Sequence, residues 1–304
     1  MFMSLFTSLV LIHLVFLDFS SCASVSGSFT YTTSDTVHHL LPEIVNLTVN
    51  INGTKFVPLQ LKRVHTMGLH TPLYTLTRDK YFRLLRSSVS FKPNKNIGYY
   101  QDIKNLASFQ IQRLNKSANR NLTFEMLRGE FEYAKQKYTL YRDNTIQYSK
   151  RTVHFHNDYR YPDGENFETF QKHQSRRRRR EASGDYYIDI TAMVDYKRWN
   201  MFLDEVKGSE FDAYRNVHEH YAYIFHRMNL PYQAITSTSF KLNIRLAKII
   251  ICENAEVSFF TGDLAKLASG HVDLRPASFL LIQFIEDHGW KHLAPFDHVM
   301  VFTG

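Results

Sequence analysis

The sequence predicts two units of different fold class: a β-rich half, residues 24–180, and an α/β half, residues 181–304, with a mostly parallel sheet covered by helices. The length of 304 residues is enough for about two domains with separate cores. Hydrophobic residues alternate in short runs in the first half, whereas runs with helical spacing separate the strands of the second. Five consecutive arginines, Arg176–Arg180, lie between the two patterns.

The chain begins with an apolar segment. Residues 1–19 contain only small polar residues, His13 and Asp18 among apolar ones, and Ser21-Cys22-Ala23 has the small side chains that signal peptidase accepts. We expect a signal peptide, residues 1–23, and secretion to the extracellular space or matrix. A membrane anchor is the alternative, but Asp18 shortens the apolar core to about 17 residues, the lower limit for a span, so we expect no membrane span.

Four asparagines stand in the N-x-S/T pattern of N-glycosylation: Asn46, Asn52, Asn115 and Asn121. All four precede the arginine run. Together with the apolar N-terminal segment they favour entry into the secretory pathway, and they predict surface positions in the first half.

The chain has two cysteines, Cys22 and Cys252, and the first belongs to the expected signal peptide. One remaining thiol excludes a disulfide scaffold and therefore a cysteine-rich growth factor. We expect Cys252 to form a disulfide with a partner outside this chain, because an odd cysteine in a secreted protein is usually paired. A buried free thiol is the alternative.

The net charge of +8 is unevenly distributed. Residues 181–304 contain 11 Lys and Arg and 16 Asp and Glu, a net charge of −5, so the first 180 residues carry +13. Opposite charges favour the encounter of the two halves. Nucleic acid is excluded as a partner by the expected secretion.

The arginine run fits the R-x-(K/R)-R pattern of proprotein convertases at Arg177, Arg178, Arg179 and Arg180. Adjacent guanidinium groups suit the acidic clefts of these enzymes. Residues 162–175 before the run are polar and lack an apolar period, as expected of an accessible linker. A nuclear or heparin-binding patch is the alternative, but we expect a convertase to cut between Arg180 and Glu181.

In the first half, apolar residues alternate over 45–51, stop at Asn52-Gly53 and resume over 56–61, which predicts a β-hairpin. Pro58 is expected to confine the returning strand to a sheet edge. Residues 138–141 and 153–155 are further strand candidates.

The second half predicts the order β-α-α-β-α-β. Leu230-Pro231 is expected to end the second helix, and Ser278 to cap the third. The expected elements are a strand over 188–194, helices over 199–206 and 211–228, a strand over 242–251 that turns inward, a helix over 279–288 and a strand over 297–303.

These elements resemble the reprolysin-type zinc metalloproteases, which include the snake-venom, ADAM and thrombospondin-repeat ADAM-like enzymes. Residues 187–195, YIDITAMVD, resemble the first catalytic strand, and residues 214–230 resemble the first long helix. Residues 240–251 are similar to the second strand, and DHVMVFTG, residues 297–304, to the segment "D.A.LLTG". The order of these pieces behind a signal peptide, a pro-region and a convertase site covers nearly the whole chain.

The resemblance implies a metzincin-like catalytic domain and a secreted zinc endopeptidase that cleaves extracellular or matrix proteins. Its HExxHxxGxxH motif is absent from this sequence, so we expect zinc ligands beyond residue 304, no catalytic residue in this chain, and an inactive fragment. The alternative is a secreted, non-catalytic matrix or binding protein with a degenerate half-domain. Residues 24–180 lack the cysteine that often blocks the zinc in this family, so latency is expected from steric cover.

Two groups of histidines partly match the spacing of a zinc-binding motif. His218-Glu219-His220 is followed by Ala222 where the second ligand is needed, so we interpret it as a polar patch on a helix. His288, His292 and His298 have the spacing of three zinc ligands. However, Gly289 replaces the glutamate base and Pro295 replaces the turn glycine, so we expect no zinc there.

The resemblance also implies calcium. Asp189 and Asp297 occupy positions at which many reprolysins bind this cation, and carboxylates are its preferred ligands. The alternative is a pair of solvated carboxylates at strand ends.

Overall fold

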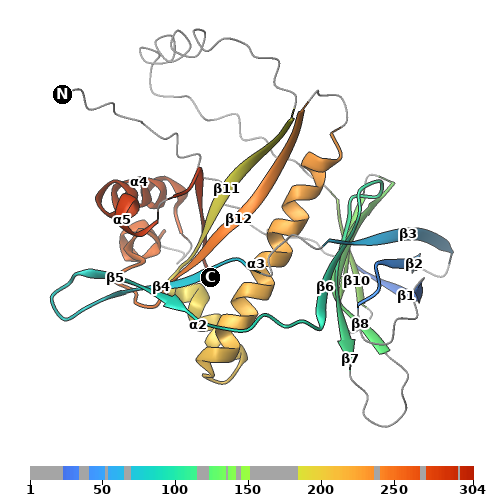
Figure 1. The fold of residues 1–304 in the computed structure, drawn as a ribbon, viewed down its shortest axis with the longest axis horizontal. Coiled ribbons are helices and arrows are strands. Elements are labelled where there is room, and N and C mark those ends of the chain that lie inside the picture. Colours follow the sequence, from blue (N-terminus) through green and yellow to red (C-terminus); the bar gives the residue numbers. More distant parts are fainter. Residues whose placement is uncertain are drawn as a thin grey trace, which may run out of the picture.

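The computed structural model describes residues 23–33, 41–51, 54–64, 70–114, 123–134, 136–141, 145–150, 184–235, 240–267, 272–293 and 295–304. Its strands form two sheets, one in a closed barrel and one in an open sheet with helices on both faces (Figure 1). The barrel lies to the right in Figure 1, and the open sheet lies to the left of helix α3.

The barrel is built from the first half of the chain. Its neighbouring strands follow the order β1-β10-β9-β8-β7-β6-β3-β2 and are antiparallel. The strands are β1 (Ala23–Thr33), β2 (Ile44–Ile51), β3 (Lys55–Val64), β6 (Ile97–Asp102), β7 (Ala107–Leu114), β8 (Thr123–Tyr133), β9 (Gln136–Tyr141) and β10 (Thr145–Lys150). Alternate residues point inward, which explains the period of two in the sequence.

The predicted hairpin is confirmed, since β2 pairs with β3 with Val49 opposite Val57. The prediction of an edge strand is wrong, because β6 pairs with β3 on its other side. That pairing covers only Lys62–Val64, however, so the missing N–H of Pro58 breaks no hydrogen bond with β6. The strand expected at 138–141 is β9, and residues 153–155 lie outside the described residues.

The open sheet has the order β13-β11-β12-β4-β5. Four strands, β13, β11, β12 and β4, are parallel, and β5 is antiparallel to β4, so the sheet is mostly parallel. The strands are β4 (Leu73–Arg78), β5 (Leu84–Val89), β11 (Gly184–Val194), β12 (Phe240–Cys252) and β13 (His298–Phe302). This sheet therefore combines strands from both expected domains, which the sequence did not predict.

The helices occur in the predicted order. They are α2 (Tyr196–Glu205), α3 (Glu210–Gln233), α4 (Leu274–Phe284) and the short α5 (Trp290–His292). Two predictions about helix ends were wrong. Helix α3 continues through Pro231 to Gln233, where a proline so close to the end costs few helical hydrogen bonds. The N-cap of α4 is Asp273, whose side chain accepts from the backbone N of Arg275, whereas Ser278 lies inside the helix.

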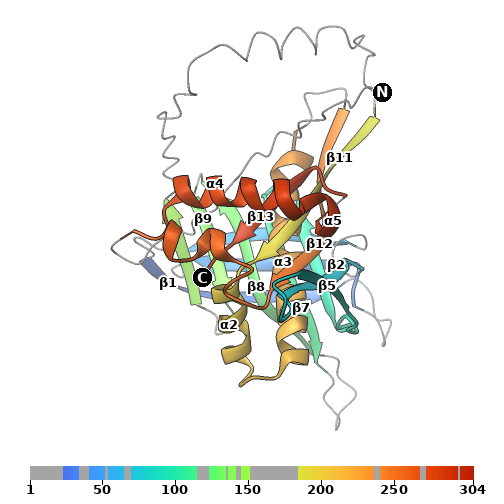
Figure 2. The ribbon, with the colours of Figure 1, turned by 90° about the vertical axis from the view of Figure 1, so that its left-hand side faces the viewer.

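The two faces of the open sheet have separate cores. On one face Ala192, Val194 and Ile251 pack against α2 and α3. On the other, Met193 and Ile250 pack against Leu281 of α4. Figure 2 shows α4 in front of the sheet, with α3 behind it. The order of layers is thus α4, sheet, α2 and α3, and barrel.

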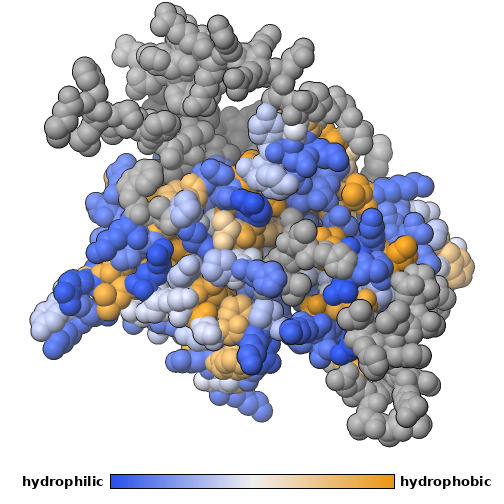
Figure 3. All heavy atoms as spheres, viewed as in Figure 1, coloured by the Kyte–Doolittle hydropathy of each residue, from blue (hydrophilic) through white to orange (hydrophobic). Residues whose placement is uncertain are grey.

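Helix α3 is enclosed on two sides, by the sheet and by the barrel. Val217, Tyr221 and Phe225 face the sheet, whereas Ala222 and Tyr223 pack against Ile97 and Tyr99 of β6. Elsewhere, on the face in Figure 3, hydrophobic residues occur as patches among hydrophilic ones.

Candidate functional site

The first candidate region is the junction, defined as the contacts between α3 and the barrel strands β6, β7 and β8. Tyr223 donates its hydroxyl hydrogen to the carbonyl of Ser108 at 3.2 Å, and Arg227 forms an ion pair with Glu130 at 2.5 Å. Lys137 of β9 pairs with the same carboxylate at 2.6 Å. Burial lowers the pKa of Lys137, while the charge of Glu130 opposes this. The junction therefore joins the two halves by charged and polar contacts.

The His218-Glu219-His220 segment lies in this junction. The segment is polar and lies on a helix, as predicted, but it is not a solvent-exposed patch. His218 is buried, and the centroid of its ring lies 4.6 Å from that of Phe91. Burial raises the pKa of Glu219 to about 7. Burial, together with the charges of Arg128 and Arg198, lowers the pKa of His220 to about 3.

Arg128 of β8 is the main barrel contact of this segment. Its guanidinium donates to the carbonyl of Glu219 at 3.2 Å, lies 3.1 Å from Nδ1 of His220 and stacks over the ring of Tyr223. Burial lowers the pKa of Arg128, and nearby Tyr and Glu side chains oppose this shift. The neutral form of His220 is thus favoured, because a second positive charge here is unfavourable.

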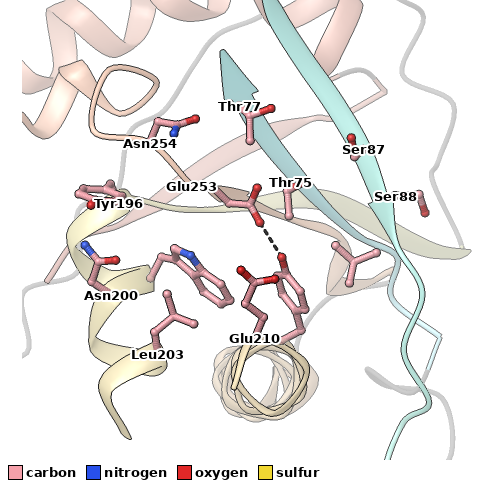
Figure 4. Close-up of a pocket in the computed structure, with 13 residues that line it drawn as sticks. Thr75, Thr77, Ser87, Ser88, Tyr196, Asn200, Leu203, Glu210, Glu253 and Asn254 are labelled. Atoms are coloured by element: carbon pink, nitrogen blue, oxygen red, sulfur yellow. Dashed lines mark hydrogen bonds between the residues drawn. The ribbon is translucent and has the colours of Figure 1, made fainter. Parts of the chain in front are cut away.

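The second candidate region is a pocket of about 600 Å³ at the carboxyl ends of β12 and β4. Crevices at such ends are common ligand sites in α/β sheets. Figure 4 shows Glu210 of α3 and Glu253 after β12 extending into the space between α2 and the β4–β5 hairpin. The described lining residues are Thr75, Thr77, Ser87, Ser88, Val89, Tyr196, Trp199, Asn200, Leu203, Glu210, Tyr214, Glu253 and Asn254.

The chemistry of the pocket suits a cation or a hydroxyl-rich group. None of the described lining residues is basic, and Tyr214 donates its hydroxyl hydrogen to Oε1 of Glu253 at 2.6 Å. Burial, followed by this bond and the charge of Glu253, raises the pKa of Tyr214. The ring of Tyr214 stacks on Trp199 with centroids 4.9 Å apart. Sequence reasoning missed this pocket, because its residues come from both halves and share no spacing.

We expect Tyr214→Phe to lower the free energy of unfolding by about 1.5 kcal/mol, since it removes a hydrogen bond to a carboxylate. Urea denaturation measures this change. Tyr232→Phe is the control, because Tyr232 lies on α3 with 37% of its side chain exposed. Equal stability of the two variants would contradict the role given to the Tyr214 hydroxyl.

The residues expected to bind calcium lie together at the start of β13. The backbone N of Asp189 donates to Oδ2 of Asp297 at 2.8 Å, and the backbone N of Asp297 donates to the carbonyl of Asp189 at 2.9 Å. However, Arg245 donates to both carboxylate oxygens of Asp189 at 2.6 Å. The hydrogen bond to Asp189 raises the pKa of Arg245. Calcium at Asp189 would have to displace this guanidinium.

The histidines with zinc-like spacing do not form a ligand set. The rings of His288 and His292 are 6.5 Å apart, and Nδ1 of His298 lies 3.2 Å from the carbonyl of Asp297. In the described part of the chain, no group of three or more His, Cys, Asp and Glu side chains is placed to hold a metal. These three histidines therefore do not fit a zinc site as the structure places them.

The remaining predicted residues lie apart from both regions. Cys252 is buried at the end of β12, where burial raises the pKa of its thiol, so an outside partner would need local opening. Asn46 is exposed on β2, as glycosylation requires. Residues 1–22 of the expected signal peptide, the other three glycosylation asparagines (Asn52, Asn115, Asn121), Arg177 to Arg180 and Glu181 lie outside the described residues, whereas Ala23 begins β1.

No family model and no curated protein matches the chain. Among the described residues, no helix has the length and apolar character needed to cross a membrane.

Proposed function

We propose that this chain is part of the precursor of a secreted zinc metalloendopeptidase, and that a proprotein convertase cuts it after Arg180. The observation that carries the proposal is the arrangement of residues 184–302. Three parallel strands, β11, β12 and β13, alternate with helices in the order expected from the reprolysin resemblance. A β-barrel built only from residues before the arginine run supports the division into a removable half and a second half.

In this proposal the chain supplies scaffold and cover rather than catalysis. No group among the described residues is placed to hold a metal, and the proposal accordingly assigns the zinc ligands to a part of the protein beyond residue 304. The first half covers the outer side of α3 and adds β4 to the edge of β12. Latency then comes from steric cover, as expected for a first half without a cysteine at 24–180.

Cleavage is tested by expressing the chain in secretory cells and sequencing the N-terminus of the secreted C-terminal fragment. We expect it to begin at Glu181, and the double variant Arg179→Ala/Arg180→Ala to abolish the fragment because no R-x-(K/R)-R pattern is left in the run. Arg151→Ala is the control, since it removes an arginine outside the run. Equal cleavage of both variants would overturn the assignment of the site.

The protease assignment needs a separate test. We expect the reading frame to continue beyond Gly304 and to encode HExxHxxGxxH. A stop codon directly after Gly304 would overturn the protease assignment and favour a secreted binding protein.

A further inference from the structure

Strands β4 and β5 belong to an arm, defined here as residues 70–91, that leaves the barrel and joins the other sheet. The arm is inserted between β3 and β6, which pair directly through Lys62 and Gln101. The barrel therefore closes without the arm. Figure 1 shows the hairpin beside β12 and α2, away from the barrel. The arm makes its strand-pairing contacts with β12 of the second half of the protein.

The arm is attached to the second half by its backbone. Residues Leu73–Leu76 run parallel to Ile249–Cys252 of β12. The backbone N of Ile249 donates to the carbonyl of Pro72 at 3.0 Å, and that of Glu253 donates to the carbonyl of Leu76 at 3.1 Å. Such strand addition supplies affinity through main-chain hydrogen bonds.

The side chains of the arm enter both cores of the open sheet. Leu73 is 1% exposed and belongs to the core beneath α2 and α3. Leu76 is fully buried in the core beneath α4. Arg86 donates to the carbonyl of His292 at 2.7 Å. Removal of the arm would thus open cavities on both faces of the sheet.

The junction provides a second, independent attachment. Arg227 with Glu130, Tyr223 with Ser108, and Gln101 with Gln233 each join one residue of the first half to one of α3. Paired charges and side-chain hydrogen bonds of this kind are typical of interfaces between separate folded units.

We propose that the first half remains bound to the second as a non-covalent partner after the chain is cut, and that the arm is the element that holds it. The inference rests on the proposed function only for the cut itself. The segment bound at the edge of β12 is accordingly Leu73–Leu76 of the same chain, an extended segment with leucines at its first and fourth positions. Cutting alone does not expose the second half.

The experiment uses the full chain with the arginine run replaced by a recognition site for a sequence-specific protease and with a different tag at each end. After complete cutting at neutral pH, we expect the fragments to co-elute in size-exclusion chromatography and to separate in denaturant. Hydrogen exchange is measured on the same sample. We expect exchange of the Ile249 and Glu253 amides to change by no more than about twofold on cutting, since both donate to the arm.

Two variants locate the attachment. Leu73→Asp places an unpaired charge in a core, so we expect the dissociation constant of its fragments to rise about tenfold or more. Leu85→Asp is the matched control on the same hairpin, because Leu85 is 45% exposed, and its fragments are expected to co-elute as in the unaltered chain.

Separate elution of the unaltered fragments, or exchange of the two amides accelerated about a hundredfold by the cut, overturns the proposal. Equal affinity of the Leu73→Asp and Leu85→Asp fragments overturns the role of the arm. If Leu73→Asp is not secreted, hydrogen exchange in the unaltered chain decides. Because the engineered cut needs no convertase, failure of cleavage at Arg180 in cells and failure of this complex are separate results.

Discussion

Gly129→Val is expected to lower the free energy of unfolding by about 3 kcal/mol. Gly129 of β8 lies directly opposite Phe109 of β7, and a Cβ atom there would overlap two ring carbons of Phe109. The ring has no exposed surface and is enclosed by the barrel core, so it cannot move aside without displacing other side chains. Glycine is therefore required at this position by close approach.

Urea denaturation compares this variant with Lys62→Val, which introduces the same side chain at an exposed position on β3. Lys62→Val is expected to change stability by no more than about 0.5 kcal/mol. If the two variants are equally stable, the Phe109 ring does not occupy the space beside Gly129.

Acid is expected to weaken the protein through His226, a buried residue of α3 that faces the barrel. Its Nε2 lies 3.2 Å from the carbonyl of Tyr100, and none of the described residues forms a hydrogen bond with its Nδ1. Burial lowers the pKa of His226 from 6.5 to about 4, although the bond to Tyr100 opposes this. The unfolded chain therefore binds a proton first as the pH falls.

The contribution of His226 to stability is complete above pH 6.5 and is lost as the pH falls from 6.5 towards 4. At pH 5 the loss is about 2 kcal/mol. Glu219 acts in the opposite direction. Because its pKa is raised from 4.5 to about 7, its contribution is complete below pH 4.5 and is lost as the pH rises through 7. Because the two effects overlap, the test compares the pH dependence of stability between variants and does not use the pH dependence of the unaltered chain alone.

Urea denaturation at pH 7.5 and at pH 5 measures the effect. The unaltered chain is expected to lose about 2 kcal/mol more than His226→Gln between these pH values, because glutamine does not titrate. His70→Gln, at an exposed histidine, is the control and should behave as the unaltered chain. The same pH dependence in His226→Gln as in the unaltered chain would exclude His226 as the source.

Local patterns in the sequence predicted several elements correctly. The Asn52-Gly53 dipeptide between alternating runs identified β2 and β3 from the sequence, because both the dipeptide and the period of two are local properties. The change from alternating to continuous apolar residues predicted the inward turn of β12, whose last five residues are buried.

Pairing between distant segments was not predictable in the same way. Residues 73–77, LYTLT, have strand-forming side chains, but nothing in them specifies β12 as the neighbour. The polar face of α3, with Glu219, His226 and Arg227, resembles a solvent-exposed face because the charges that pair with it lie on the barrel. The pocket was missed for the same reason, since Glu210 and Glu253 meet only when α3 and β12 are packed together.

Closure of the barrel determines how a detached first half would behave. Each barrel strand has a neighbour on both sides, whereas β4 of the arm loses its neighbour β12 when the two halves separate. A free arm would present Leu73 and Leu76 next to unsatisfied amides and carbonyls, the combination that promotes strand-by-strand aggregation. A cell that separates the two halves must therefore degrade the first half or shield its hairpin, and the rate of that clearance would limit how fast the second half becomes free.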